Sequence, residues 1–173
     1  MIHSRPRDWR VPLLALSALV ILFDRLTKIW VTLHIELGQA IPVIPRVFRI
    51  THVLNSGAAF SLFADSLSPE RVRLMLIAFS VVAAVAVFAV LLKMGHQFTL
   101  TTVSLALILG GAIGNLYDRL RFASVVDFLE VYILSYHWPD FNLADSAIVV
   151  GAILLMLDAF RGTRPASLES RAS

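Results

Sequence analysis

Two aspartates in apolar surroundings are the residues of this 173-residue chain best suited to acid–base chemistry. Asp127 stands within Val-Val-Asp-Phe-Leu, and Asp145, 18 positions later, stands within Phe-Asn-Leu-Ala-Asp-Ser. Two carboxyl groups in close contact cannot both ionise easily, so they share a proton and supply one base and one acid. Such a pair can activate water and polarise a carbonyl group, which hydrolyses a peptide bond without a metal. We therefore predict Asp127 and Asp145 as a catalytic pair, on the condition that the fold brings them together.

Each aspartate also has a purely structural interpretation. A single carboxylate flanked by apolar residues, such as Asp127, is also typical of a strand edge or a membrane interface. Asn142 can cap a helix that begins after it, which places Asp145 at the N3 position of a capping box and near the positive end of the helix dipole. Capping and catalysis are compatible, because a helix N-terminus would hold the Asp145 carboxylate ionised and fixed.

Asp24 and Lys28 lie four residues apart in an apolar segment, in the order that favours an ion pair on one helix face. The functional alternative is a lysine head that contacts lipid or steadies the site. The segment Asn55-Ser-Gly-Ala-Ala-Phe60 is typical of a turn with Gly57 at positive φ.

Gly110 and Gly114 form a small-xxx-small pattern, which is typical of closely packed membrane helices. Such packing would bring the polar residues that follow near the axis of a bundle. Arg119 suits the C-terminus of a helix, whereas Asn115, one turn earlier, has no such explanation. Asp118 lies between them in sequence.

The composition argues against other chemistries. The chain has no cysteine, which excludes disulfides, thiolate metal sites and a cysteine nucleophile. The five histidines are scattered, with no His-Glu-x-x-His zinc signature, and no Gly-x-Ser-x-Gly segment or phosphate-binding glycine loop is present. The net charge is +3, but no run of five basic residues indicates nucleic-acid binding. We therefore predict no metal, no cofactor and no nucleic-acid partner.

The hydrophobic content of 58% and the charged content of 16% indicate that this chain is embedded in a lipid bilayer. A membrane span needs about 20 residues. We predict one integral membrane domain over residues 1–173, an all-α bundle of four transmembrane helices. The first apolar segment follows a basic start, as in a signal peptide, but it is long and has no clean cleavage site, so we interpret it as an uncleaved span. The predicted spans are about 11–33, 72–92, 98–116 and 143–160.

Four spans place both termini on one side of the membrane. The higher density of Lys and Arg in the termini and in the turn at 93–97 places these parts in the cytoplasm. The two outer connections, 34–71 and 117–142, contain a strand pattern at 47–54 and aromatic residues suited to the interface. We therefore expect ordered structure there, able to hold an extended peptide beside the bilayer. The tail at 161–173 is predicted to be disordered.

Five sequence blocks together resemble the lipoprotein signal peptidase family, also called signal peptidase II. They occur in the family's order and spacing and cover the chain from about residue 11 to 160. Each block is weak alone, whereas five in order are highly specific, and no motif position departs from the pattern. The blocks are Asp24-Arg-Leu-Thr-Lys28, Asn55-Ser-Gly-Ala-Ala-Phe60, Gly110-Gly-Ala-Ile-Gly-Asn-Leu-Tyr-Asp-Arg119, Val125-Val-Asp-Phe128 and Phe141-Asn-Leu-Ala-Asp-Ser146.

The resemblance implies a role for individual residues. Asp127 and Asp145 match the family's catalytic aspartates. Residues that match positions expected to bind substrate or orient the aspartates are Asn55, Gly57, Asn115, Arg119 and Asn142. Residues expected to support the site are Asp24, Lys28 and Asp118.

The resemblance also implies an architecture and a reaction. The family has four transmembrane helices, a periplasmic β-cradle and a short extramembrane helix. The implied substrate is a prolipoprotein with a diacylglyceryl-modified cysteine, cleaved just before that cysteine, and the implied inhibitor is the cyclic peptide globomycin. We expect a monomer among membrane lipids of the bacterial inner membrane, with the active site at the periplasmic face.

Two other classes of protein compete with this interpretation. A proton- or ion-coupled transporter could use an Asp/Asn/Arg relay, but it predicts polar residues along the whole membrane depth and inverted repeats. The predicted acidic residues instead gather at the outer edge, and the second and third spans carry no charge through their middles. A purely structural role as a membrane scaffold would not explain why polar residues gather at the outer edge.

Overall fold

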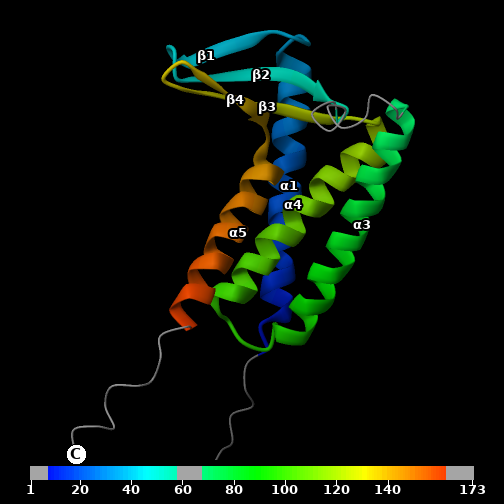
Figure 1. Cartoon of the computed structure of the whole chain (residues 1–173), viewed down its shortest axis with the longest axis vertical. Helices are drawn as coiled ribbons and strands as arrows, with labels where there is room; N and C mark the ends of the chain where they lie inside the picture. The colour runs from blue at the N-terminus through cyan, green and yellow to red at the C-terminus, as the bar shows by residue number, and fades with distance from the viewer. Residues whose placement is uncertain (1–7, 58–67, 163–173) are drawn as a thin grey trace, which may run out of the picture.

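The computed structural model describes residues 8–57 and 68–162. Four long helices form a bundle, and a small sheet lies at one end of it (Figure 1). Helix α4 is central, because it packs against each of the other three helices. The helices are α1 (Arg10–His34), α3 (Pro69–Met94), α4 (Leu100–Phe122) and α5 (Leu143–Gly162).

Three of the described helices, α3, α4 and α5, are long and apolar enough to cross a membrane. Helix α1 has 25 residues, but its outer half carries Asp24, Arg25 and Lys28. These three charges, rather than a lack of apolar residues, set α1 apart from the other three helices. The first predicted span, at 11–33, therefore corresponds to a long helix whose charges need partners inside the bundle.

Helix α4 continues past residue 116, where the predicted third span ends, as far as Phe122. Asn115, Asp118 and Arg119 therefore lie on the helix itself. Hydropathy falls at Asp118, but that carboxylate is fully buried against Lys28, so its charge does not end the helix. The helix ends at Ala123, which adopts the left-handed conformation with φ 63°.

Glycines on two faces of α4 allow close helix packing, as the sequence pattern predicted. A Cβ atom on Gly110 would lie 2.8 Å from the Ser17 carbonyl oxygen of α1. A Cβ atom on Gly111 would lie 2.3 Å from the Ala144 carbonyl oxygen of α5. The Ser17 hydroxyl also donates to the Ala106 carbonyl oxygen at 2.7 Å, which ties α1 to α4. The inner half of the bundle is filled by Leu13, Ala84, Leu91, Leu105, Ala106 and Leu109.

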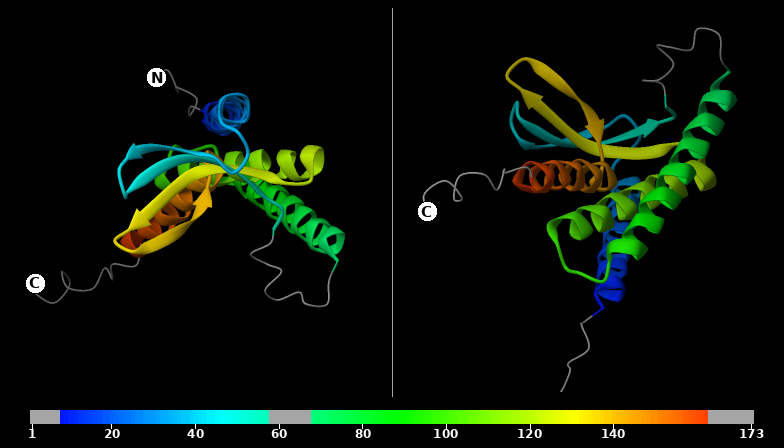
Figure 2. Two further views of the ribbon diagram at one scale, coloured as in Figure 1. Left: turned by 90° about the horizontal axis from the view of Figure 1, so that it is seen from above. Right: turned by 60° about the horizontal axis from the view of Figure 1, so that its bottom comes forward.

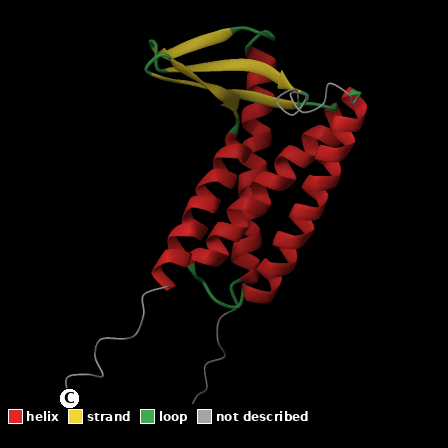
Figure 3. Ribbon diagram, in the orientation of Figure 1, coloured by secondary structure: helices red, strands yellow, loops and turns green. Residues whose placement is uncertain are grey.

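Four antiparallel strands form the sheet, in the order β1-β2-β3-β4 (Figure 3). The strand predicted at 47–54 is confirmed by β2, whereas β1 and β4 have no counterpart among the predicted strands. No separate helix occurs in the described parts of the two outer connections, and residues 58–67, where the remainder lies, fall outside the described residues. The strands are β1 (Ala40–Ile44), β2 (Phe48–Asn55), β3 (Val125–Ile133) and β4 (Tyr136–Phe141).

The sheet covers the end of the bundle where α4 ends and α5 begins. Seen from above, the strands cross over the helix ends (Figure 2). Phe128 of β3 packs with Val31 and Ile35 of α1 in a second buried apolar cluster. This cluster fixes β3 against α1 and so determines the height of Asp127 above the bundle.

Gly111→Leu is expected to destabilise the fold, because its side chain would overlap the α5 backbone at Ala144. Overpacking of this kind costs about 1–3 kcal/mol or more. We expect a lower midpoint of thermal unfolding in detergent than for Ala86→Leu, which adds the same side chain at an exposed position of α3. Equal midpoints for the two variants would contradict the close contact between α4 and α5.

Candidate active site

Asp127 lies on β3 with only 2% of its surface exposed. Asn55, on the neighbouring strand β2, donates from Nδ2 to Asp127 Oδ2 at 2.9 Å. Asn142 donates from Nδ2 to Asp127 Oδ1 at 2.7 Å. Each carboxyl oxygen of Asp127 therefore accepts one amide hydrogen bond, which fixes the plane of the carboxyl group.

Gly57 acts on Asp127 through Asn55. The Gly57 N–H donates to Asn55 Oδ1 at 2.9 Å, which turns the amide so that its nitrogen faces Asp127. Gly57 has φ 89°, as predicted from the turn sequence, and a Cβ atom there would lie 2.5 Å from Leu76 Cδ1. A side chain at residue 57 would therefore be strained by both its backbone and its neighbour.

Asp145 lies in the first turn of α5 and forms the predicted capping box with Asn142. The Asp145 N–H donates to Asn142 Oδ1 at 3.0 Å, and the Asn142 N–H donates to Asp145 Oδ2 at 3.2 Å. From α4, Asn115 Nδ2 donates to Asp145 Oδ1 at 2.7 Å. The structural interpretation of Asp145 is thus correct, and the same bonds hold its carboxylate at the site.

Asn142 joins the two aspartates, since it is hydrogen-bonded to both of them. The structure therefore brings both aspartates to one asparagine, and their catalytic role stays a prediction. Burial raises the pKa of Asp127 to about 6, and the nearby charge of Asp145 acts in the same direction. The hydrogen bonds from Asn55 and Asn142 oppose this increase in the pKa. Its surroundings therefore make Asp127 a weaker acid than an exposed aspartate.

A buried cation lies directly behind the two aspartates. Lys28 Nζ lies 2.8 Å from Asp24 Oδ2, 2.7 Å from Asp118 Oδ2 and 3.0 Å from Asn115 Oδ1. Asp24 Oδ1 accepts the Ala144 N–H of α5 at 3.0 Å. The predicted pair of Asp24 and Lys28 is confirmed, and it orients Asn115, whose Oδ1 is held by Lys28 while its nitrogen faces Asp145.

Residues 16–161 match the family model described as Signal peptidase (SPase) II. The chain belongs to the signal peptidase II family. The lipoprotein signal peptidase of Geobacter metallireducens is 44% identical over 154 residues, which cover 89% of this chain and 93% of the relative. That of Pseudomonas aeruginosa strain UCBPP-PA14 is 45% identical over 159 residues, with 91% and 93% covered.

Two solved structures, each described as a bacterial membrane enzyme, share the fold. One has a TM-score of 0.77 at 27% identity and covers 93% of this chain and 100% of its own. The other has a TM-score of 0.79 at 24% identity, with 96% and 100% covered. The family resemblance predicted from five sequence blocks is thereby confirmed. Membership of a signal peptidase family indicates a peptidase and does not favour the transporter alternative.

Arg25 belongs to the buried ionic cluster of this signal peptidase II, although the sequence analysis did not single it out. It pairs with Asp118 and lies over the Tyr117 ring, 4.8 Å from the ring centroid. The sequence signal for Arg25 is a second cation in an apolar helix, which requires an anionic partner. With Arg25, the cluster contains two cations and two carboxylates, Asp24 and Asp118.

Arg119 is the predicted site residue that the described contacts do not bring to the aspartates. Among the described residues, its guanidinium reaches the Asn115 carbonyl oxygen at 3.5 Å. The Arg119 carbonyl oxygen accepts a hydrogen bond from Arg73 of α3 at 3.2 Å. The role of Arg119 toward a substrate therefore stays a prediction.

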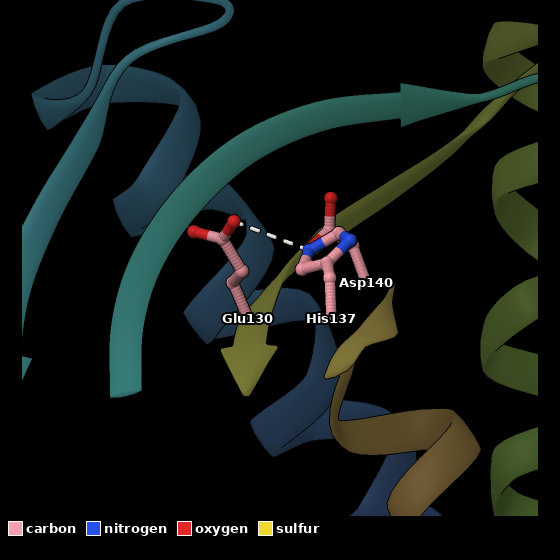
Figure 4. A group of neighbouring side chains, drawn as sticks. All are labelled: Glu130, His137 and Asp140. Carbon is pink, nitrogen blue, oxygen red and sulfur yellow. Dashed lines mark ion pairs between the residues drawn. The ribbon is translucent and has the colours of Figure 1, made fainter. Parts of the chain in front are cut away.

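A separate group of polar side chains lies on the sheet, formed by Glu130, His137 and Asp140 (Figure 4). His137 Nε2 lies 3.2 Å from Glu130 Oε1 and 3.5 Å from Asp140 Oδ1. Arg49 donates to both carboxyl oxygens of Glu130 at 2.5 Å, and this contact lowers the pKa of Glu130. Since the guanidinium already supplies the positive charge, we assign this group a role in joining β2, β3 and β4.

Lys28→Met is expected to unfold or severely weaken the outer end of the bundle. The change leaves Asp24 and Asp118 buried without their shared cation, and breaking a buried ion pair in this way costs about 3–5 kcal/mol. The measurement is the free energy of unfolding in a mixed micelle. Lys93→Met, at an exposed position near the inner end of α3, is the matched control and should leave stability unchanged. Equal stability of both variants would show that Lys28 does not hold the cluster.

Proposed function

We propose that this chain is an aspartic endopeptidase of the bacterial inner membrane that removes the signal peptide from prolipoproteins. It cleaves just before the diacylglyceryl-modified cysteine. The observation that supports this function best is the arrangement of Asp127 and Asp145 around Asn142, which bonds to both. Family membership supplies the class of reaction, and the paired carboxyl groups supply the catalytic type.

One carboxyl group acts as the general acid and the other acts as the general base. Burial favours the proton on Asp127, so Asp127 acts as the acid that polarises the scissile carbonyl oxygen. Asp145 lies in the first turn of α5, where the helix dipole favours a carboxylate, and acts as the base. Asp145 takes a proton from water, and the resulting hydroxide attacks the carbonyl carbon while Asp127 donates its proton to the oxygen. Collapse of the tetrahedral intermediate breaks the C–N bond: Asp145 gives its proton to the leaving amine, and the protonated oxygen returns its proton to Asp127 as the carbonyl group re-forms.

The membrane is part of the substrate recognition in this proposal. A precursor with two acyl chains and an apolar signal helix is held in the bilayer, so it must reach the site by moving laterally. Asp145 at the start of α5 and Asn115 near the end of α4 lie at one end of the bundle, which supports a site at the outer interface. Helix α1 begins and α5 ends at the opposite end of the bundle from the sheet (Figure 1). This arrangement supports four spans with both termini in the cytoplasm and the site at the periplasmic face, in a monomer surrounded by lipid.

The direct test is the incubation of the purified protein with a diacylated prolipoprotein and with the same precursor lacking its lipid. We expect shortening of the diacylated form alone, with cleavage before the modified cysteine as determined by mass spectrometry. Globomycin is expected to stop it. Cleavage that ignores both the lipid and globomycin would overturn the proposed substrate.

Asp127→Asn and Asp145→Asn should each abolish cleavage, since loss of a general acid or base removes about 10²–10⁴-fold or more of the rate. The measurement is precursor turnover, with thermal unfolding as the check that both variants fold. Asp140→Asn changes an aspartate of the same outer region that lies outside the pair, and it should retain activity. Normal turnover by a folded Asp127 or Asp145 variant would refute the assignment.

The pH dependence of kcat/KM should be bell-shaped, because only the singly protonated pair is active. The alkaline limb should begin near pH 6 in the free enzyme, where Asp127 ionises. Asn55→Ala removes a hydrogen bond that favours ionised Asp127, so the pKa rises and the alkaline limb should move to higher pH. An alkaline limb that stays in place, or moves to lower pH, would show that Asp127 is not the group that titrates there.

A further inference from the structure

The two faces of the outer sheet differ in polarity. Directly paired residues of an antiparallel sheet lie on the same face. The paired rows on one face are apolar across all four strands, and a further pair continues the same face toward the β3–β4 turn. The first row is Ile44, Phe48, Val131 and Trp138, the second is Ile41, Ile50, Leu129 and Phe141, and the further pair is Ile133 with Tyr136.

The opposite face carries the charges. Arg49 pairs directly with Glu130, and Tyr132 pairs directly with His137. The Tyr132 hydroxyl donates to Glu130 Oε1 at 2.9 Å. His137 Nε2 lies 3.2 Å from the same oxygen (Figure 4), so these side chains satisfy one another. The sheet therefore has one face suited to water and one suited to an apolar medium.

The apolar face is uncovered toward the tips of the two hairpins. Tyr136 is 58% exposed, Trp138 is 49% exposed, and Leu134 in the β3–β4 turn is 96% exposed. Leu134 also has φ 59°, a conformation that favours glycine or asparagine. An apolar residue that is both strained and fully exposed indicates a partner that is absent from the isolated chain. The neighbouring β1–β2 turn exposes Ile44 and Val47.

The sheet is held at the level where α5 begins. β4 ends at Phe141 and α5 begins at Leu143, so one residue, Asn142, connects them. At about 3.3 Å per residue, Tyr136 lies roughly 17 Å along the strand from Phe141. The hairpins project sideways past α5 (Figure 1). Their apolar face therefore extends beyond the bundle at the height of the interface.

The apolar face is continuous with the surface of the helices. A cavity of about 260 Å³ lies between the sheet and the outer end of α1, lined by Trp30, Ile50 and Leu129 among others. A second apolar groove, of about 630 Å³, lies between α1 and α5, and Thr27 lines both. Arg46, exposed in the β1–β2 turn, is placed to pair with a lipid phosphate while its stem covers apolar surface.

We propose that the apolar face of the sheet rests on the outer leaflet, with the two hairpin tips among the phospholipid headgroups and upper acyl chains. Trp138 and Tyr136 occupy the interface, where aromatic side chains with a polar group are favoured. Leu134 inserts as the deepest residue of the sheet. This inference rests on the proposed topology, in which the sheet lies at the outer surface, and its test does not depend on catalysis.

The absence of cysteine from the chain allows single labels without background. We choose Leu134→Cys and Trp138→Cys on the apolar side, with His137→Cys on the polar face as the matched control. Each variant carries an environment-sensitive fluorophore in vesicles of phosphatidylethanolamine and phosphatidylglycerol. At residues 134 and 138 we expect blue-shifted emission that is quenched by lipids spin-labelled near the top of the acyl chain. At residue 137 we expect quenching by aqueous iodide instead.

The same measurement distinguishes other occupants of this face. Labels at 134 and 138 that stay accessible to iodide would overturn the proposal. Shielding that increases with the protein-to-lipid ratio would assign the face to a second copy of the chain, and shielding that requires added precursor would assign it to substrate. Either result would also overturn it. Failure of precursor cleavage with normal lipid quenching would count against the proposed function alone.

A second experiment tests whether contact between the sheet and lipid affects precursor cleavage. Leu134→Asp should lower precursor cleavage several-fold in vesicles relative to detergent micelles, because a charge at the tip opposes insertion. His137→Asp should show the same vesicle-to-micelle ratio as the unaltered protein. An unchanged ratio for Leu134→Asp would show that contact between the sheet and lipid does not influence the site.

Discussion

The architecture depends on a buried lysine that needs two carboxylates at once. Lys28 and its partners Asp24 and Asp118 are 0–1% exposed, and a charge buried in this way is tolerated only when its ionic and hydrogen-bonding partners are all present. Asp24 and Lys28 come from α1, Asp118 comes from α4, and Asp24 also accepts the Ala144 N–H of α5. The cluster therefore fixes the positions of three helices relative to one another. The helices can satisfy these groups only in one register, so the cluster specifies the outer end of the bundle.

The relative positions of these helices determine the geometry of the aspartate pair, because two asparagines connect the ionic cluster to the two aspartates. Lys28 and the Asn142 amide both donate to Asn115 Oδ1, so the Asn115 nitrogen is left to face Asp145. Asn142 uses its backbone and its side chain together, because it caps α5, holds Asp145 and donates to Asp127. Neutral amides suit this task, since they orient carboxyl groups without adding a charge that would force both to ionise. The observed capping role of Asp145 and its proposed catalytic role therefore depend on the same set of bonds.

Hydropathy and local motifs predicted the helices, strand β2, the capping box and the pair of Asp24 and Lys28, because each depends on neighbours in sequence. Hydropathy alone gave a third span that stops at residue 116, short of the end of α4, since it cannot distinguish an exposed Asp118 from one neutralised by a residue on another helix. Strands β1 and β4 were missed because their patterns contain proline and charged residues at edges of the sheet. Arg25 was missed for a related reason: its partner lies on another helix. Local periodicity carries no information about charged residues that pair with partners far away in the sequence.

The position of Asn142 makes the height of the sheet and the geometry of the aspartate pair interdependent. This residue alone separates β4 from α5, and it bonds to both Asp127 and Asp145. A rotation of the sheet relative to α5 must therefore pass through Asn142 and would change the angle between the two carboxyl groups. An amphipathic sheet that rests on lipid would resist such a rotation, since lifting the apolar face into water is unfavourable. In the proposed arrangement, the bilayer surface would both present the substrate and help to hold the two carboxyl groups in the orientation that cleavage requires.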